Sequence, residues 1–386
     1  MPDNPFHPKI TKPGEEDVDK TAEFLAAISG KEDADRYREL VAGTSRSPRK
    51  PRVDLGKLAA AALASQEGLL AASFDKQTES LPSELKREYY QQVKSLSEIG
   101  FLETDEHGEK GVTGIDGKFY QLPTLQQVAA HFNAPERKAF IDRKFEQGFT
   151  RLLITPFAAP LDSFYDKARA VILEHRSGTD PSKKLLAADG SELICVQKDP
   201  FNIGSTYHRQ DIEGHLVYNI TKLVNSMTGG ETVHGGGKTK KEILSDDHQP
   251  FPGFRVQLLQ QDLVIPRKGK GTAINGRPAL EAGKTGSYYL ALLQNPKSPY
   301  YNEHGLFIED WISLFATVLH ETNTVIDDCA DGVASLSLLI GSLRLFNDNY
   351  FPDGFWWRQR DGGIACVNGR GSDRAWDDVG VRTAVG

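Results

Sequence analysis

Cysteine is scarce in this chain of 386 residues, which has only Cys195, Cys329 and Cys366. Three widely spaced thiols exclude a disulfide framework or a cysteine-based zinc cluster, and they favour reduced thiols inside the cell. Long hydrophobic runs are also lacking, and the first residues, Met1–His7, do not have the pattern of a signal peptide. We therefore expect a cytoplasmic protein that does not engage a membrane.

Excess positive charge is the second absence, because the formal net charge is -7. Broad electrostatic attraction to nucleic acid or to an anionic membrane would need a basic surface, so neither partner is expected. The one local exception is the basic run 45–52, which carries Arg46, Arg49, Lys50 and Arg52. A nucleic-acid contact there stays open as an alternative, but a solvated linker is the favoured interpretation.

Motifs of the common enzyme classes are incomplete. The sequences Gly235–Thr239 and Ala282–Thr285 both end in Gly-Lys-Thr, yet neither has the first glycine of a phosphate-binding loop. His320 is followed by Thr324 where a zinc helix needs its second histidine, and the chain has no Gly-x-Ser-x-Gly elbow. We predict a protein that is not an enzyme and that holds no metal and no cofactor.

The pattern along the chain predicts an α+β protein with four parts. Residues 1–55 are polar and rich in proline and charge, as in a disordered tail. Residues 56–133 are expected to be helical and 134–200 to form a small α/β unit. Residues 201–386 are richer in short strands, turns and glycine, and they predict a final mixed domain.

Several individual elements can be predicted from periodicity. Helices are expected at 58–72, 83–99 and 125–131, and two further helices from the apolar spacing of Leu161 to Ile172 and of Trp311 to Val325. Strands are expected at 151–155, 193–196 and 254–258.

The C-terminal segment 352–385 differs in composition from the rest of the chain. It contains three of the four tryptophans, together with Arg358, Arg360, Arg370 and Arg374 and many small polar residues. Rigid aromatic rings beside adaptable hydrogen-bonding groups are typical of binding surfaces. A terminal hairpin that packs on the core is the alternative, and it explains Trp356 better than it explains the arginines.

This segment resembles a known family. The pairing of Pro352-Asp-Gly-Phe-Trp-Trp357 with Asp378-Val-Gly-Val-Arg-Thr-Ala-Val385 is similar to the variable region of target proteins of diversity-generating retroelements. The stretch Gln260–Gly271 and the tripeptide Glu309-Asp-Trp311 are similar to segments of such proteins, so the resemblance covers roughly residues 200–386. It implies a C-type-lectin-like fold, related to formylglycine-generating enzymes, in the C-terminal domain.

The resemblance also implies roles for individual residues. Reverse transcription at template adenines would rewrite chosen surface positions on a fixed scaffold, to which Trp356, Gly380 and Arg382 would belong. The candidates for the variable ligand face are Phe355, Trp357, Arg358, Gln359, Arg360, Cys366, Asn368, Arg370, Ser372, Arg374, Trp376 and Asp377. The expected ligand is a macromolecule, a protein in the first place. Trp357 and Trp376 would be its apolar anchors, and the arginines would bind acidic groups.

The same fold leaves two alternatives open. A formylglycine-generating type of oxidase would need two active cysteines in the C-terminal core, and the segment has Cys366 alone. A static phage or structural adhesin would share the fold without the variation.

Overall fold

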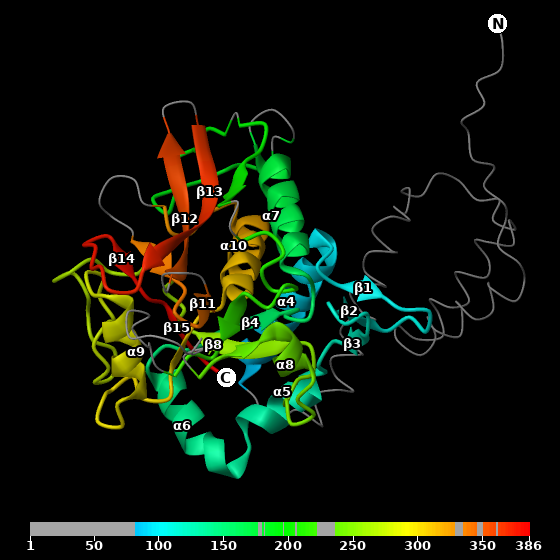
Figure 1. The fold of residues 1–386 in the computed structure, drawn as a ribbon, viewed down its shortest axis with the longest axis horizontal. Helices are drawn as coiled ribbons and strands as arrows, with labels where there is room; N and C mark the ends of the chain where they lie inside the picture. Colours follow the sequence, from blue (N-terminus) through cyan, green and yellow to red (C-terminus); the bar gives the residue numbers. More distant parts are fainter. Residues whose placement is uncertain are drawn as a thin grey trace, which may run out of the picture. The chain divides into compact units, whose positions relative to one another are not determined.

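The structure is a computed structural model that describes residues 82–386 except 177–179, 181, 196, 205–206, 222–235, 329–334, 346–349 and 360–361. It is a mixed α+β architecture, as the sequence predicts (Figure 1). The described residues belong to one compact unit, Ser73–Gly386. The expected tail 1–55, the helix at 58–72 and the basic run with Arg46, Arg49, Lys50 and Arg52 lie outside the described residues.

The helices begin and end at local sequence signals. They are α4 (Ser83–Ile99), α5 (Leu125–Phe132), α6 (Pro135–Glu146), α7 (Leu161–His175), α8 (Lys240–Leu244), α9 (Gly286–Gln294) and α10 (Ile308–Thr322). Thr124 and Gln127 form a reciprocal capping box at the start of α5. Gly100 ends α4 in the left-handed conformation, at a φ of 82°, and its N–H bonds the last carbonyls of the helix.

Most elements predicted from periodicity are confirmed. The predicted helix at 83–99 and the predicted strand at 151–155 agree with α4 and β4 (Arg151–Thr155), and α10 carries the apolar spacing around Trp311. The strand expected at 193–196 is wrong for its described residues, where the backbone is irregular and Leu193 donates its N–H to the Leu185 carbonyl (2.7 Å). The sequence patterns do not predict helices α6, α8 and α9.

Three sheets organise the strands. The smallest joins β1 (Glu103–Thr104), β2 (Lys110–Thr113) and β3 (Phe119–Gln121). A second has the order β4, β8 (Arg255–Leu259), β15 (Thr383–Val385), β9 (His304–Gly305). The largest has the order β14 (Val379–Gly380), β10 (Leu336–Leu338), β12 (Tyr350–Gln359), β11 (Ser342–Arg344), β6 (Leu216–Tyr218), β7 (Lys238–Thr239); β13 (Gly362–Gly371) pairs with β12 and with β5 (Phe201–Ile203).

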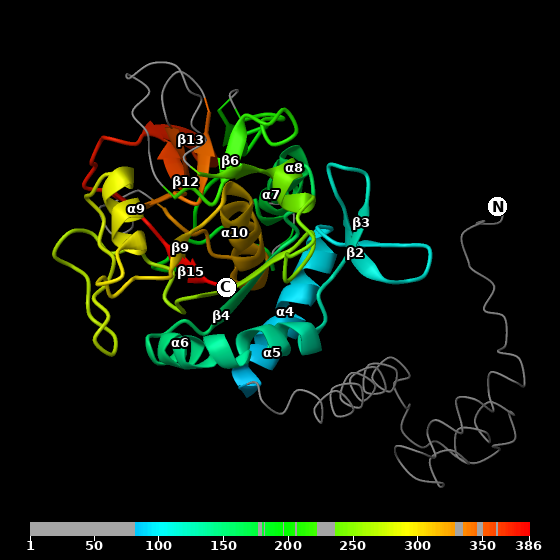
Figure 2. The ribbon, with the colours of Figure 1, turned by 60° about the horizontal axis from the view of Figure 1, so that its bottom comes forward.

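Helix α10 lies at the centre of the fold, and Figures 1 and 2 show α4 and α7 beside it. Its residues from Ile308 to Leu319 are all buried, so the helix is enclosed on every side. This stretch includes the polar residues Glu309, Asp310, Ser313 and Thr317. The buried ammonium of Lys240 on α8 lies 2.8 Å from Glu309 of α10 and 2.8 Å from Asp211, so a fully enclosed ion network fastens α8 to α10.

One core crosses the domain boundaries expected from the sequence. The main cluster of buried apolar side chains runs from Leu85 on α4 to Val385 at the C-terminus. In the second sheet, β4 from the expected middle unit pairs with β8 from the expected final domain. The boundaries at 133 and 200 therefore do not separate independent cores. Sequence composition changes at these places, but the packing does not.

A second, smaller core lies on the other side of the largest sheet. It joins Tyr289, Leu290 and Leu293 of α9 to Phe351 and Phe355 of β12. From Phe351 to Trp356, strand β12 is thus covered on both faces, by the main core on one and by this cluster on the other. Among the described residues, no helix combines the length and the apolar character that crossing a membrane requires.

Candidate ligand-binding face

The candidate face is built on a long hairpin. Strands β12 and β13 pair without interruption from Tyr350 opposite Gly371 to Gln359 opposite Gly362. Side chains of a strand alternate between its two faces, so neighbours in sequence have opposite surroundings. Trp356 is fully buried, whereas Trp357 is 48% exposed.

One face of the hairpin is locked against α10. The Trp356 ring stacks on Phe315, with ring centroids 6.3 Å apart and an interplanar angle of 15°. A Cβ at Gly363 would approach the Trp356 ring to 2.3 Å, and one at Gly354 would approach the Trp311 ring equally closely, 2.3 Å. Both glycines are required because the two large rings occupy the space that a side chain would need.

The opposite face corrects two of the candidate residues. Phe355 and Cys366 lie opposite each other in the ladder, and they are only 7% and 1% exposed. Both belong to the smaller core with α9. Because the second core covers this part of β12 and β13, neither side chain can meet a ligand at the surface, and we remove both from the candidate face.

The arginines of the hairpin are engaged within the chain. Arg358 binds Asp328, with its Nε 2.8 Å from Oδ2, and Arg370 binds Asp353, with 2.5 Å between Nε and Oδ2. Asp353 is buried, and burial raises the pKa of its carboxyl while Arg370 opposes that rise. The expectation that these two arginines are free to bind an acidic ligand is therefore corrected: each already balances a carboxylate.

The segment after β13 presents the exposed candidates. Arg374 and Asp377 are exposed, Trp376 is 43% exposed and Ser372 is half-buried. The Arg370 guanidinium lies 5.2 Å from the centre of the Trp376 ring, which ties this segment to the hairpin by a cation–π contact. Asn368 is half-buried opposite Asp353.

The start of α9 adds residues that were not among the sequence candidates. Ser287 donates from its N–H (3.2 Å) and its Oγ (3.0 Å) to the carbonyl of Ser372, so α9 supports the exposed segment. Tyr288 is exposed beside it, and the Lys284 ammonium lies 5.4 Å from the Tyr288 ring centre. The helical period that buries Tyr289 could have indicated an exposed Tyr288.

The residues assigned to the scaffold are enclosed. Arg382 donates from Nη2 to Oδ1 of Asp327 (2.8 Å), and Trp311 donates from Nε1 to Oδ2 of the same carboxylate (2.7 Å). Asp327 therefore joins α10 to the C-terminal strand region. A Cβ at Gly380 would lie 2.5 Å from the Ile265 side chain, so no larger residue fits there without movement.

Two candidates cannot be placed in full. Arg360 lies outside the described residues, and for Gln359 the structure gives the strand position only.

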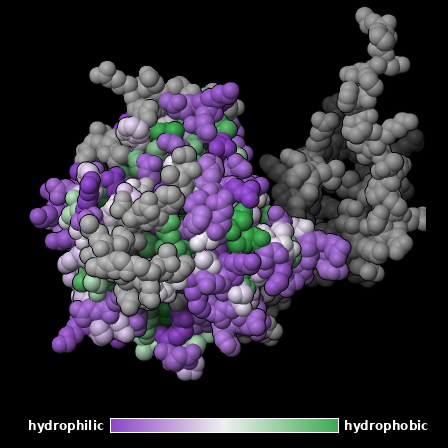
Figure 3. Space-filling model, viewed as in Figure 1, coloured by the Kyte–Doolittle hydropathy of each residue, from purple (hydrophilic) through white to green (hydrophobic). Residues whose placement is uncertain are grey.

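In the described part of the chain, no group of three His, Cys, Asp or Glu side chains is arranged to hold a metal ion. The surface in Figure 3 is mostly hydrophilic with small, separate hydrophobic areas.

Comparisons with known proteins give no relatives. No family model matches this chain, and neither the curated proteins nor the solved structures contain a significant match.

Proposed function

We propose that this protein is a ligand-binding protein whose C-terminal surface is diversified by a retroelement and recognises a macromolecular ligand, in the first place a protein. In this proposal the C-terminal part has a C-type-lectin-like fold of the formylglycine-generating-enzyme type, and the chain binds its ligand without catalysing a reaction. The proposal starts from the resemblance of segments 352–357 and 378–385 to variable regions.

The observation that carries the proposal is the separation of fixed and exposed residues within one short segment. Trp356 and Arg382 are enclosed by the core, whereas Trp357, Arg374 and Trp376 reach the surface. A binder that must vary needs this separation, because a substitution at an exposed position away from the core changes stability little.

The proposed face is smaller than the one inferred from the sequence. It keeps Trp357, Asn368, Ser372, Arg374, Trp376 and Asp377, and it gains Lys284 and Tyr288 at the start of α9. Arg358 and Arg370 leave the face because each is bonded to a carboxylate of the chain. Trp357 and Trp376 supply apolar contact area, and Arg374 supplies hydrogen-bond donors that are not buried in the fold.

Sequencing of the DNA that flanks the gene tests the proposal. We expect a reverse transcriptase gene and a near-copy of the codons for residues 352–385 that differs from the gene almost only at adenines. The differing codons should fall on the exposed positions and spare Trp356, Gly380 and Arg382. A locus with no near-copy would overturn diversification, and the protein would then be a static adhesin or an oxidase of the formylglycine-generating type. Copper-dependent oxygen consumption with a cysteine peptide as substrate would identify the oxidase.

A further inference from the structure

The buried ion network that joins α8 to α10 contains one cation and two carboxylates. Lys240 is fully buried, and its ammonium contacts three oxygens, those of the Ala159 carbonyl, Asp211 Oδ2 and Glu309 Oε1, each at 2.8 Å. Asp211 is 1% exposed and Glu309 is 0% exposed. With both carboxylates ionised, one positive charge would face two negative charges, and the interior of the protein would hold an excess negative charge.

The surroundings of this network are apolar. The Lys240 ammonium lies 5.1 Å from the centre of the Phe157 ring and 5.9 Å from that of the Phe164 ring. Both rings belong to the main core and are buried. An ionised carboxylate without a partner is so unfavourable in such surroundings that the group takes up a proton instead.

The hydrogen bonds leave one oxygen of each carboxylate unused. Asp211 Oδ2 accepts the N–H of Leu161 at 2.8 Å, in addition to Lys240. Glu309 Oε1 accepts the hydroxyl of Tyr218 at 2.7 Å, again in addition to Lys240. Among the described residues, Asp211 Oδ1 and Glu309 Oε2 have no hydrogen-bond partner. A proton on Glu309 Oε2 would remove the excess charge without breaking any of these bonds.

The electrostatics place the proton on Glu309. Burial raises the pKa of its carboxyl; Lys240 opposes this rise, and the Asp211 carboxylate adds to it. The folded protein therefore binds this proton more tightly than the unfolded chain does. The titratable groups of the region are Lys240 on α8, Asp211 in the turn 208–214, Tyr218 on β6, Tyr165 on α7 and, around Tyr165, Asp162 and Tyr207.

We propose that this network is a pH-sensitive contact, in which the folded protein holds one proton on Glu309 and α8 separates from α10 when that proton leaves. While the proton is bound, the Lys240 ammonium is balanced by the Asp211 carboxylate alone. Once it leaves, Glu309 Oε2 is an ionised oxygen without a donor. We expect α8 and the turn 208–214 to move, because α8 has only five residues whereas α10 is enclosed by the core.

The proposal fixes the sign of the pH dependence. In the unfolded chain the Glu309 carboxyl has its ordinary pKa of 4.5, and in the folded protein the pKa is raised. The stability that the bound proton contributes is therefore fully present below pH 4.5 and is lost as the pH rises through the folded pKa.

Glu309→Gln tests the bound proton, because the amide is uncharged and close in size to a protonated carboxyl. At about pH 6, exposed glutamates are ionised, so the infrared spectrum of the wild type minus that of the variant should show the C=O stretch of one protonated carboxyl. Above pH 4.5, the folding equilibrium constant of the wild type should fall by up to about tenfold for each pH unit relative to the variant, since unfolding releases one proton.

Trypsin tests the movement of α8. Cleavage after Lys240 requires this buried side chain to leave the core. At about pH 9, at or above the pKa of documented buried glutamates, the full-length wild type should be cleaved there several-fold faster than Glu309→Gln. At about pH 6, where the wild type keeps its proton, the two proteins should be cleaved at equal rates.

Two further variants complete the test. Asp211→Asn leaves one carboxylate for Lys240, so Glu309 should ionise and the carboxyl band should disappear, as in Glu309→Gln. Glu213→Gln is the matched control, because this carboxylate lies in the same turn and is 44% exposed; it should behave as the wild type does.

Two results would overturn the bound proton, namely a folded wild type without the carboxyl band at about pH 6 or a pH slope equal to that of Glu309→Gln. Equal cleavage of the two proteins at about pH 9 would overturn the movement of α8. Neither result would touch the proposed function, which depends on the near-copy beside the gene.

Discussion

The hairpin β12–β13 and the segment 372–377 that follows it share an aromatic and arginine-rich composition, yet the fold treats them in opposite ways. In the hairpin, Phe355 and Cys366 are buried and Arg358 is bonded to Asp328. In the segment, Arg374 and Trp376 are exposed. The difference shows that a composition suited to binding does not by itself locate a binding surface. Where both faces of a strand are covered, as at Phe355 and Trp356 of β12, aromatic side chains become part of the core, whereas Trp357 of the same strand stays 48% exposed.

The largest expected effect separates two adjacent tryptophans. Trp356→Ala removes a fully buried ring that stacks on Phe315, and we expect the free energy of unfolding to fall by about 3–5 kcal/mol. Trp357→Ala should cost less than about 1 kcal/mol, because nearly half of that side chain is exposed. Urea denaturation of both variants measures the difference. Equal losses of unfolding free energy would contradict the burial of Trp356 and the exposure of Trp357.

The next test compares two arginines. Among the described residues, Arg382→Met leaves the buried Asp327 carboxylate with Trp311 as its one remaining hydrogen-bond donor, so the free energy of unfolding should fall by roughly 3 kcal/mol. Adding Asp327→Asn should recover part of the loss, because the uncompensated charge is then removed. Arg374→Met is the surface control, with an expected change within about 0.5 kcal/mol. A large loss of unfolding free energy in Arg374→Met would mean that Arg374 stabilises the fold and is not a free surface residue.

Acid should lower the free energy of unfolding through the half-buried side chain of His131. Burial, helped by the charge of Arg137, lowers the pKa of His131 to about 4, whereas in the unfolded chain it is about 6.5. The unfolded state therefore takes up a proton first, and the stability present above pH 6.5 is lost as the pH falls towards 4. His131→Gln should flatten this part of the pH profile of the unfolding free energy. An unchanged slope would exclude His131 as its source.

Sequence patterns predict the parts of this molecule whose structure is set locally. The helix at 83–99 and the strand at 151–155 follow from the spacing of apolar residues, because that spacing reflects which face meets the core. Alternation along β12 predicts two faces as well, but it does not predict that α9 covers the second one. The burial of Phe355 depends on that long-range packing.

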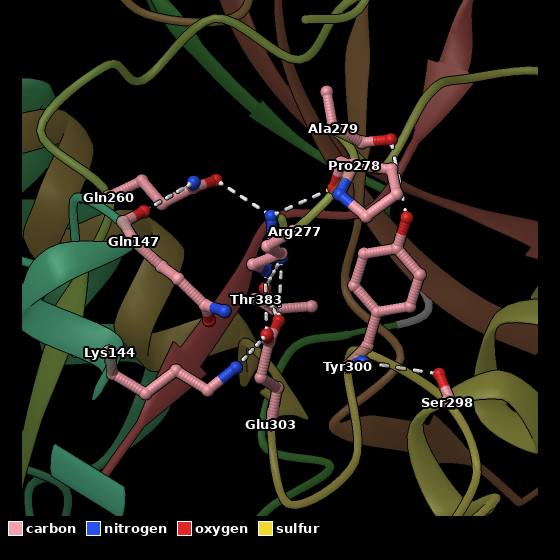
Figure 4. Close-up of polar contacts among 10 residues, drawn as sticks. All are labelled: Lys144, Gln147, Gln260, Arg277, Pro278, Ala279, Ser298, Tyr300, Glu303 and Thr383. Atoms are coloured by element: carbon pink, nitrogen blue, oxygen red, sulfur yellow. Dashed lines mark hydrogen bonds and ion pairs between the residues drawn. The ribbon is translucent and has the colours of Figure 1, made fainter. Parts of the chain in front are cut away.

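The candidate site was predictable as a segment, and less so residue by residue. The partners of Arg358 and Arg370 are 30 and 17 residues away along the chain, and no local pattern indicates such pairs. The buried contacts of Glu303 with Arg277 and Lys144, shown in Figure 4, likewise join residues that are 26 and 159 positions apart along the chain.

The smallest expected effect bears most directly on variation. Trp376→Ala removes an exposed ring and its contact with Arg370, so the unfolding free energy should fall by at most about 1 kcal/mol. In a library of displayed variants that carry every amino acid at positions Arg374, Trp376 and Asp377, nearly every member should then resist protease. Cleavage follows the population of unfolded chains, which these substitutions should change little. The same library at Trp356, Gly363 and Gly380 should lose most members, since each position is filled by its neighbours. If both libraries survived equally, the fold would not separate stability from recognition, and the segment 372–377 would have no advantage as a place for change.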